Sequence, residues 1–133
     1  MTMEIRPLDR SRLVFEYDLH TQRLFPWPLL NAPFQGCWSI VEPGTSSRPH
    51  AHHEYEIWIA AKGAGEIEAD GARRPFAAGD VVHFTPGTEH FALNDKGAGE
   101  NLEFYSIWWD TELAVAFLDR HAAETDQRAQ EGE

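Results

Sequence analysis

The chain has 133 residues, a length that suits a single domain. Hydrophobic residues make up 42% of it and charged residues 25%, proportions typical of a folded protein and unlike those of a disordered one. Eleven Lys and Arg residues against 22 Asp and Glu residues give a formal charge of −11, which argues against nucleic acid or a membrane surface as a partner. No apolar run approaches the roughly 20 residues of a membrane helix, and residues 1–12 lack the apolar stretch of a secretory signal. The single cysteine, Cys37, cannot form an internal disulfide, so we expect a cytoplasmic protein in which Cys37 is a small core residue.

Residues 1–24 are mixed and polar, and they form a predicted N-terminal extension with one edge strand near residues 13–17. Residues 25–28, Phe-Pro-Trp-Pro, are expected to cover the core as an apolar lid, with contact to a partner as the alternative. From there to residue 110, Gly or Pro recurs at short intervals, and this spacing predicts an all-β sandwich or barrel over residues 25–110. The predicted strands lie at residues 37–41, 55–61, 66–69, 81–85, 90–93 and 102–109.

Two turns and a helix complete this outline. Asp70 and Gly71 are a strong signal for a type I′ hairpin, and residues 94–99 predict a looser hairpin connection. After Asp110, a candidate N-cap, Leu113 and Phe117 recur at helical spacing and Leu118 broadens the apolar stripe. Residues 111–133 are therefore predicted to hold one C-terminal α-helix, followed from residue 124 by a frayed acidic tail.

The chain holds seven histidines, and three of them fall within four residues. On a strand, alternate side chains share a face, so His50, His52 and Glu56 are expected to point the same way. Two imidazoles and a carboxylate form half a shell for a divalent metal, and burying them without one would be costly. His90, which follows a tight turn at residues 86–87, is the best candidate for a fourth ligand. Nitrogen and oxygen donors with open coordination positions suit zinc, iron(II), manganese, nickel or copper, and open positions imply ligand binding or chemistry.

Three neighbouring residues have weaker claims on this site. Glu54 shares the parity of Glu56, so a bulge or a register error would exchange their roles. His53 has the opposite parity, so we expect it to be exposed or to contact one of the metal-coordinating residues without itself binding the metal. His83 is the candidate catalytic acid or base in the cavity, with a buried, hydrogen-bonded histidine as the alternative.

These residues resemble the two sequence motifs of the cupin family. The first motif, G(X)5HXH(X)3–4E(X)6G, is matched by Gly44, His50, His52, Glu56 and Gly63. The second, G(X)5PXG(X)2H(X)3N, is matched by Gly79, Gly87, His90 and Asn94, with Thr85 where the first proline is usual. The resemblance implies a double-stranded β-helix, or jelly-roll, barrel with one divalent metal ion inside, and frequently a homodimer. Carried over position by position, it implies His50, His52, Glu56 and His90 as the ligands, with zinc favoured over iron, manganese or nickel.

In a barrel of this kind, inward residues of several strands would wall a pocket for a small molecule. Trp58 has the parity of Glu56 and is a candidate wall residue. On the strand at 102–109, either Phe104, Ser106 and Trp108 or Tyr105, Ile107 and Trp109 face the metal, and the sequence leaves both sets open. Arg48 either binds a carboxylate at the pocket mouth or is a solvated surface residue.

The family does not name a reaction, so three functions stay open. The first is a metal-dependent enzyme, such as a dioxygenase, isomerase or decarboxylase-like protein, that acts on a small organic molecule at an open metal position. The second is a non-catalytic module that holds a small ligand. The third follows from a similarity of residues 32–56 and 102–110 to the cupin part of two-part proteins that make hydrazine N–N bonds. Those proteins join a zinc-binding cupin to a methionyl-tRNA-synthetase-like module, so this reading implies a synthetase-like partner.

Overall fold

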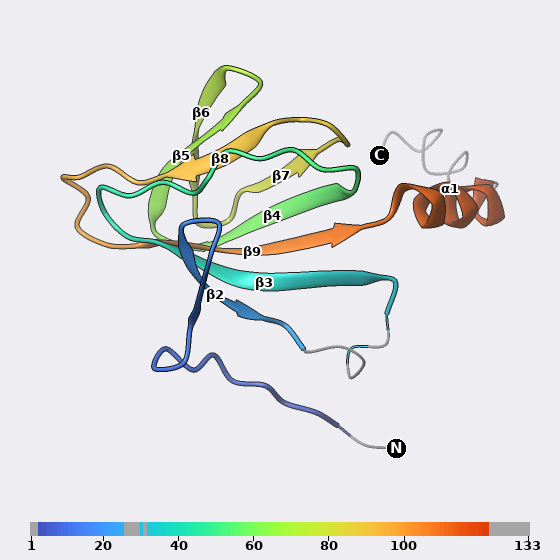
Figure 1. Cartoon of the computed structure of the whole chain (residues 1–133), viewed down its shortest axis with the longest axis horizontal. Coiled ribbons are helices and arrows are strands. Elements are labelled where there is room, and N and C mark those ends of the chain that lie inside the picture. Colours follow the sequence, from blue (N-terminus) through green and yellow to red (C-terminus); the bar gives the residue numbers. More distant parts are fainter. Residues whose placement is uncertain (1–2, 26–29, 31, 123–133) are drawn as a thin grey trace.

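The computed structural model describes residues 3–25, 30 and 32–122 of the chain. Within these residues the strands form two antiparallel sheets, and a helix follows the last strand (Figure 1). The larger sheet has the strand order β1 (Val14–Glu16), β2 (Leu19–Arg23), β3 (Phe34–Val41), β9 (Leu102–Trp109), β4 (Tyr55–Lys62) and β7 (Val81–Phe84). The smaller sheet has the order β6 (Ala72–Ala77), β5 (Ala64–Ala69) and β8 (His90–Leu93).

The hydrophobic core lies between the two sheets. Alternation along β4 directs Glu56, Trp58 and Ala60 inward, while their neighbours on the strand lie on the outer face. The Trp58 ring packs against Phe104 of β9, with ring centroids 4.4 Å apart, and against Phe84 of β7 at 4.9 Å. The smaller sheet supplies the opposite wall of the core through Ile67, Phe76 and Ala92.

The predicted strands are present, and one connection differs from the prediction. Asp70 and Gly71 form the turn between β5 and β6, both with positive φ, as a type I′ hairpin requires. Residues 94–99 do not form a hairpin connection, because β8 belongs to the smaller sheet and β9 to the larger one. This segment instead carries the chain from one sheet to the other, and the side chain of Asn94 donates hydrogen bonds to the carbonyls of Val41 and Glu100.

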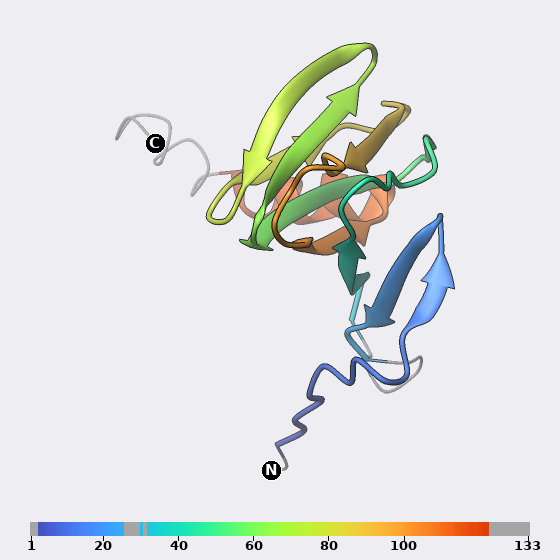
Figure 2. The same cartoon turned by 90° about the vertical axis from the view of Figure 1, so that its left-hand side faces the viewer.

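The N-terminal region takes part in the larger sheet. The predicted edge strand near residues 13–17 is β1, and β2, which the sequence analysis did not predict, pairs with β3. The sheet therefore begins within residues 1–24, before the predicted barrel at 25–110. Figure 2 shows the β1–β2 hairpin, in blue, standing beside the strands of the barrel.

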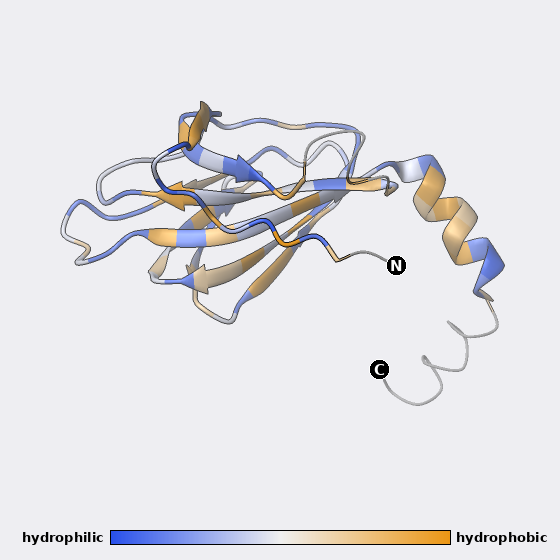
Figure 3. Ribbon diagram, turned by 90° about the horizontal axis from the view of Figure 1, so that it is seen from below, coloured by the Kyte–Doolittle hydropathy of each residue, from blue (hydrophilic) through white to orange (hydrophobic). Residues whose placement is uncertain are grey.

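The C-terminal helix α1 (Thr111–Arg120) begins at the predicted N-cap, where the side chain of Asp110 accepts a hydrogen bond from the Glu112 N–H. Its apolar stripe is exposed, and Figure 3 shows the helix extending beyond the strands. Among the described residues, no helix combines the length and apolar character that crossing a bilayer requires. The predicted tail from residue 124 and most of the predicted lid at 25–28 lie outside the described residues.

Candidate metal centre

Backbone pairing brings the two histidine segments together. His50 and His90 form an antiparallel bridge in which each backbone N–H donates to the other residue's carbonyl, at 3.3 and 3.0 Å. The Gly87 N–H donates to the carbonyl of His52 at 2.8 Å, and Gly87 has a φ of +81°, a conformation that side chains other than that of glycine seldom adopt. The turn before His90 is therefore fixed against the segment that carries the other two histidines.

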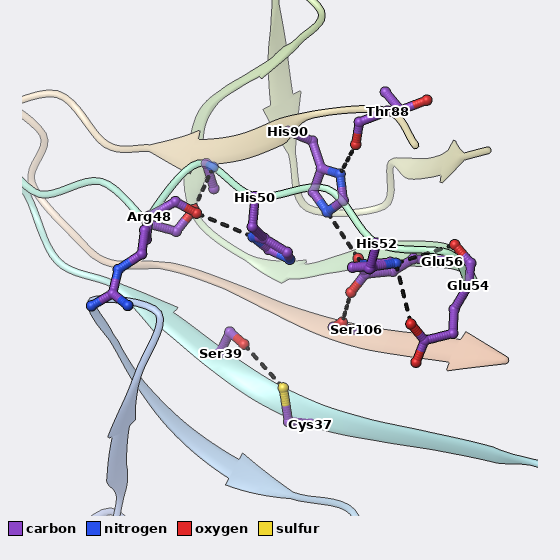
Figure 4. A network of polar contacts seen from close by, with 12 residues as sticks. Cys37, Ser39, Arg48, His50, His52, Glu54, Glu56, Thr88, His90 and Ser106 are labelled. Carbon is purple, nitrogen blue, oxygen red and sulfur yellow. Dashed lines mark hydrogen bonds and ion pairs between the residues drawn. The ribbon is translucent and has the colours of Figure 1, made fainter. Parts of the chain in front are cut away.

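The predicted ligand atoms converge on one point. One donor atom from each of His50, His52, Glu56 and His90 lies within 4.8 Å of the other three. The Nε2 atoms of His52 and His90 each lie 2.9 Å from Glu56 Oε1, and Figure 4 shows these rings directed at the carboxylate. His50 and His52 precede β4 instead of sharing a strand with Glu56, so the expected common strand face is not what aligns them.

A backbone carbonyl orients the ring of each of the three histidines in the cluster. Nδ1 of His50 contacts the carbonyl of Arg48 at 3.1 Å, Nδ1 of His52 that of Glu54 at 3.2 Å, and Nδ1 of His90 that of Thr88 at 2.8 Å. Because a carbonyl oxygen only accepts hydrogen bonds, Nδ1 carries the proton in each ring. Nε2 is therefore the atom that each ring has left for the centre, and it binds a metal ion once it carries no proton.

The electrostatics of the centre favour a charged carboxylate. Burial alone would raise the pKa of Glu56, but hydrogen bonds from His52, His90 and Ser106 outweigh it and hold the pKa well below its ordinary value. Burial lowers the pKa of His50, whereas the hydrogen bond to Glu56 raises the pKa of His52. The Trp58 indole N–H is buried near Glu56, and among the described residues it has no hydrogen-bond partner of normal geometry.

This donor set fits a divalent metal ion. Three neutral imidazole nitrogens and one carboxylate oxygen are ligands that zinc, iron, manganese and nickel all accept. A divalent ion would also neutralise a carboxylate that is only 4% exposed. Four protein donors would leave one or two positions of a five- or six-coordinate ion open, and the cavity lined by His50, His52 and Glu56 gives a further ligand access to it.

A cavity of about 290 Å³ opens beside the metal centre. It settles the orientation of the last strand, because the set Phe104, Ser106 and Trp108 lines it together with Trp58, while Tyr105 lies on the other face. Ser106 also donates a hydrogen bond to Glu56 Oε2. Besides His50, His52 and Glu56 of the metal centre, the remaining wall residues are Glu16, Tyr17, Leu19, Thr21, Arg23, Cys37, Ser39, Ser47 and Glu54.

Five of these wall residues come from the β1–β2 hairpin, and sequence reasoning missed them. Arg23 lies opposite Cys37, which lies opposite Ser106, so its side chain shares the inward face of the sheet. The Arg23 guanidinium lies 5.0 Å from the centre of the Trp108 ring and forms an ion pair with Glu16 at 3.1 Å. No local sequence signal marks these residues, because their direction depends on pairing with β3.

The structure places two predicted residues elsewhere. His83 is exposed and does not line the cavity, because Phe84 and not His83 is the β7 residue opposite Glu56. Its ring stacks on Tyr55 and Trp109 at the outer face of the sheet, so its position gives no support to a role as acid or base at the metal. The side chain of Arg48 is 62% exposed and forms an ion pair with Asp18, outside the cavity wall.

The neighbours of the ligands lie close to their predicted places. Glu54 lines the cavity, and its Oε1 lies 3.6 Å from His52 Nδ1, but it does not belong to the converging set. The side chain of His53 is 76% exposed, as expected. Cys37 is buried beside Ser39, and burial raises the pKa of its thiol to about 11.

Comparison with known proteins identifies the family. Residues 37–108 match the Cupin domain family. A Cupin 2 conserved barrel domain protein from Salinispora arenicola is 52% identical, with 91% of this chain and 100% of that chain covered and a TM-score of 0.77. The plu4264 protein from Photorhabdus luminescens is 40% identical, with 90% and 98% covered and a TM-score of 0.77. A Thermotoga maritima protein named as a predicted oxalate decarboxylase (tm1287) is 25% identical, with 68% and 79% covered and a TM-score of 0.62. The cupin barrel predicted from the two motifs is thus confirmed, and the chain belongs to the cupin domain family.

Proposed function

We propose that this cupin binds one divalent metal ion through His50, His52, Glu56 and His90 and acts on a small organic molecule at an open coordination position. The observation that carries the proposal is the common orientation of the three imidazoles. Each Nδ1 is held by a backbone carbonyl, and the four donor atoms lie within 4.8 Å of one another. A histidine held only by core packing has no need of this arrangement.

The protein residues around the centre have separable roles. When bound, the metal ion would act as a Lewis acid toward a coordinated oxygen or nitrogen of the substrate. Ser106 holds one oxygen of Glu56, and the Trp58 N–H is available to donate to a bound ligand. The rings of Phe104 and Trp108 line the cavity and exclude water from the reacting end of the substrate.

The first test is metal analysis of the protein purified without added metal. We expect about one equivalent of a divalent ion in the wild type and its loss in His50→Ala and Glu56→Ala. His83→Ala is the matched control, because it removes a histidine outside the cluster and should keep its metal. Wild-type protein that neither holds a metal nor gains thermal stability from added zinc, iron, manganese or nickel would contradict the proposal.

The identity of the metal separates the kinds of chemistry. Iron together with substrate-dependent oxygen uptake would support a dioxygenase. Tightly held zinc without oxygen chemistry would support an isomerase or lyase, a class consistent with the predicted decarboxylase among its relatives.

Zinc also fits the alternative of a cupin that assists N–N bond formation, for which binding of a synthetase-like protein would be the decisive result. A ligand that binds without turnover would indicate a binding module, and the homodimer stays a prediction.

A further inference from the structure

The tip of the β1–β2 hairpin has an unfavourable backbone conformation. Glu16 pairs with Leu19, so the turn contains only Tyr17 and Asp18, with φ values of +51° and +64°. Turns that require two positive φ values favour Asn and Gly, and a bulky residue such as tyrosine is a clear exception. The turn chemistry therefore does not explain why a tyrosine occupies this position.

Contacts with the metal-ligand segment hold Tyr17 in place. The Arg48 N–H donates to the carbonyl of Tyr17 at 2.8 Å, and the Arg48 side chain forms an ion pair with Asp18 at 3.2 Å. The Tyr17 ring stacks on the ring of His50, with centroids 4.7 Å apart and planes inclined by 27°. Figure 4 shows this hairpin, in blue, reaching Arg48 beside the histidines. The tyrosine thus contacts a predicted metal ligand from the mouth of the cavity.

Tyr17 is also available to a ligand. It lines the cavity and is 52% exposed, so part of its ring is open to a molecule that enters there. The hairpin lies outside residues 37–108, which match the family. The part of the wall that carries Tyr17 is therefore supplied by this chain's own N-terminal region, which is where selectivity within a shared metal site can arise.

We propose that Tyr17 is a specificity-determining residue, which packs against the body of a molecule bound at the metal and favours planar, unsaturated ligands. This inference rests on the proposed function. Aromatic rings stack on planar groups, and Trp108 presents a second ring on the cavity wall. The contacts with Arg48 and His50 hold Tyr17 in its unfavourable backbone conformation and keep its ring at the mouth of the cavity.

The test uses the metal-loaded full chain and two probes with the same chelating group. Acetohydroxamate and benzohydroxamate both bind divalent metals through the hydroxamate, and they differ in a methyl group against a phenyl ring. We expect isothermal titration of the wild type to show about 10-fold tighter binding of benzohydroxamate, consistent with one favourable aromatic contact. Tyr17→Asn should reduce this preference to about 2-fold and leave the affinity for acetohydroxamate unchanged, while Tyr17→Phe should retain it.

Thermal unfolding supplies the readout that distinguishes selectivity from structure. Asn adopts positive φ more readily than Tyr, so the metal-free Tyr17→Asn protein should melt no lower than the wild type. Asp70→Asn is the matched control, since it changes another residue with positive φ, keeps an acceptor for the Glu89 N–H, and should not alter the preference. An unchanged preference in Tyr17→Asn, or a wild type with no preference, would overturn the inference alone. Metal-loaded protein that binds neither hydroxamate would overturn the proposed function together with it.

Discussion

Ser106 on β9 donates a hydrogen bond to Glu56 Oε2 across the β4–β9 pair, while Glu56 Oε1 faces His52 and His90. Both partners are buried, with Glu56 and Ser106 each 4% exposed. One carboxylate oxygen is thus fixed by the sheet and the other is directed at the histidine cluster. Ser106 is therefore a positioning residue for the proposed metal ligand.

Removal of this hydroxyl should weaken metal binding without unfolding the protein. We expect Ser106→Ala to lower metal affinity about 10- to 100-fold, the usual effect of losing a partner that orients a ligand. Competition with a chromophoric chelator measures the affinity. Ser39→Ala removes a buried hydroxyl that contacts the Cys37 thiol and should leave the affinity unchanged. Equal affinities in the wild type and Ser106→Ala would show that the Ser106 hydrogen bond does not orient Glu56.

Metal affinity should decrease as the pH falls. Metal binding needs the unprotonated Nε2 of each histidine, and the hydrogen bond to Glu56 raises the pKa of His52 above its ordinary value of 6.5. Burial lowers the pKa of His50, so protons compete with the metal for His50 only at lower pH.

The raised pKa of His52 also affects the stability of the metal-free protein. The stabilising contribution of protonated His52 is complete below its unfolded pKa and is lost as the pH rises through the raised folded value.

We therefore expect proton release when metal binds near pH 7, mainly from His52. Isothermal titration in buffers with different ionisation enthalpies measures the number of protons. His20→Ala, which changes a histidine outside the cluster, should give the wild-type number. An affinity that stays constant between pH 8 and pH 6 would rule out this proton competition.

A second buried carboxylate should stabilise the fold. Glu103 is 1% exposed and accepts two hydrogen bonds from Arg10, at 2.7 and 3.0 Å, and one from Trp38 Nε1 at 2.9 Å. We expect Glu103→Gln to lower the free energy of unfolding by about 1–3 kcal/mol, because the charged hydrogen bonds are lost. Glu68→Gln, which removes a more exposed pair with Arg73, should cost at most about 1 kcal/mol.

The effect of Glu103 should also depend on pH. Burial alone would raise the pKa of Glu103, but the hydrogen bonds from Arg10 and Trp38 leave it below its ordinary value. A lowered folded pKa stabilises the protein above the unfolded pKa, near 4.5, and this stabilisation is lost as the pH falls through the folded value. Urea unfolding at pH 7 and in acid should show the difference between wild type and Glu103→Gln decreasing with acidity. A difference independent of pH would mean that the charge of Glu103 contributes nothing.

The single thiol should react slowly in the folded protein. Burial raises the pKa of Cys37 to about 11, so only about one thiol in a thousand is ionised at pH 8. We expect its reaction with a disulfide reagent at pH 8 to be on the order of 100-fold slower than in urea-unfolded protein. A folded-state rate equal to the unfolded rate would contradict the buried placement of Cys37.

The sequence allowed prediction of the centre because the spacing and turn residues are local properties. The spacing of the histidines and the match to the two family motifs selected the four residues that the structure brings together, although His50 and His52 precede β4 and do not share a strand with Glu56. The face of β9 could not be chosen, since both sets of alternating residues contain large aromatic side chains. Pairing of Ser106 with Trp58 across the β4–β9 register determines that face.

Long-range pairing also explains why the sequence did not predict some of the residues in the cavity wall. Arg23 lines the cavity because β2 pairs with β3 in one particular register, and the polar sequence of β2 gives no sign of it. Tyr17 lies at the mouth because Arg48, which is 31 positions along the chain, holds the hairpin tip. For His83, the apolar Phe84 beside it was the better indicator of the inward face, since Phe84 is 3% exposed and packs in the core.

The position of Glu56 and His90 on different sheets has a consequence for the stability of the whole domain. Glu56 lies on β4 in the larger sheet and His90 on β8 in the smaller one, 34 positions apart. A metal ion coordinated by both would act as a cross-link between the two halves of the barrel and would close the chain segment between them. At a metal concentration 1,000 times its dissociation constant, such linkage would add about 4 kcal/mol to the stability of the folded state. The amount of folded protein in a cell would then follow the supply of the metal as well as the rate of synthesis.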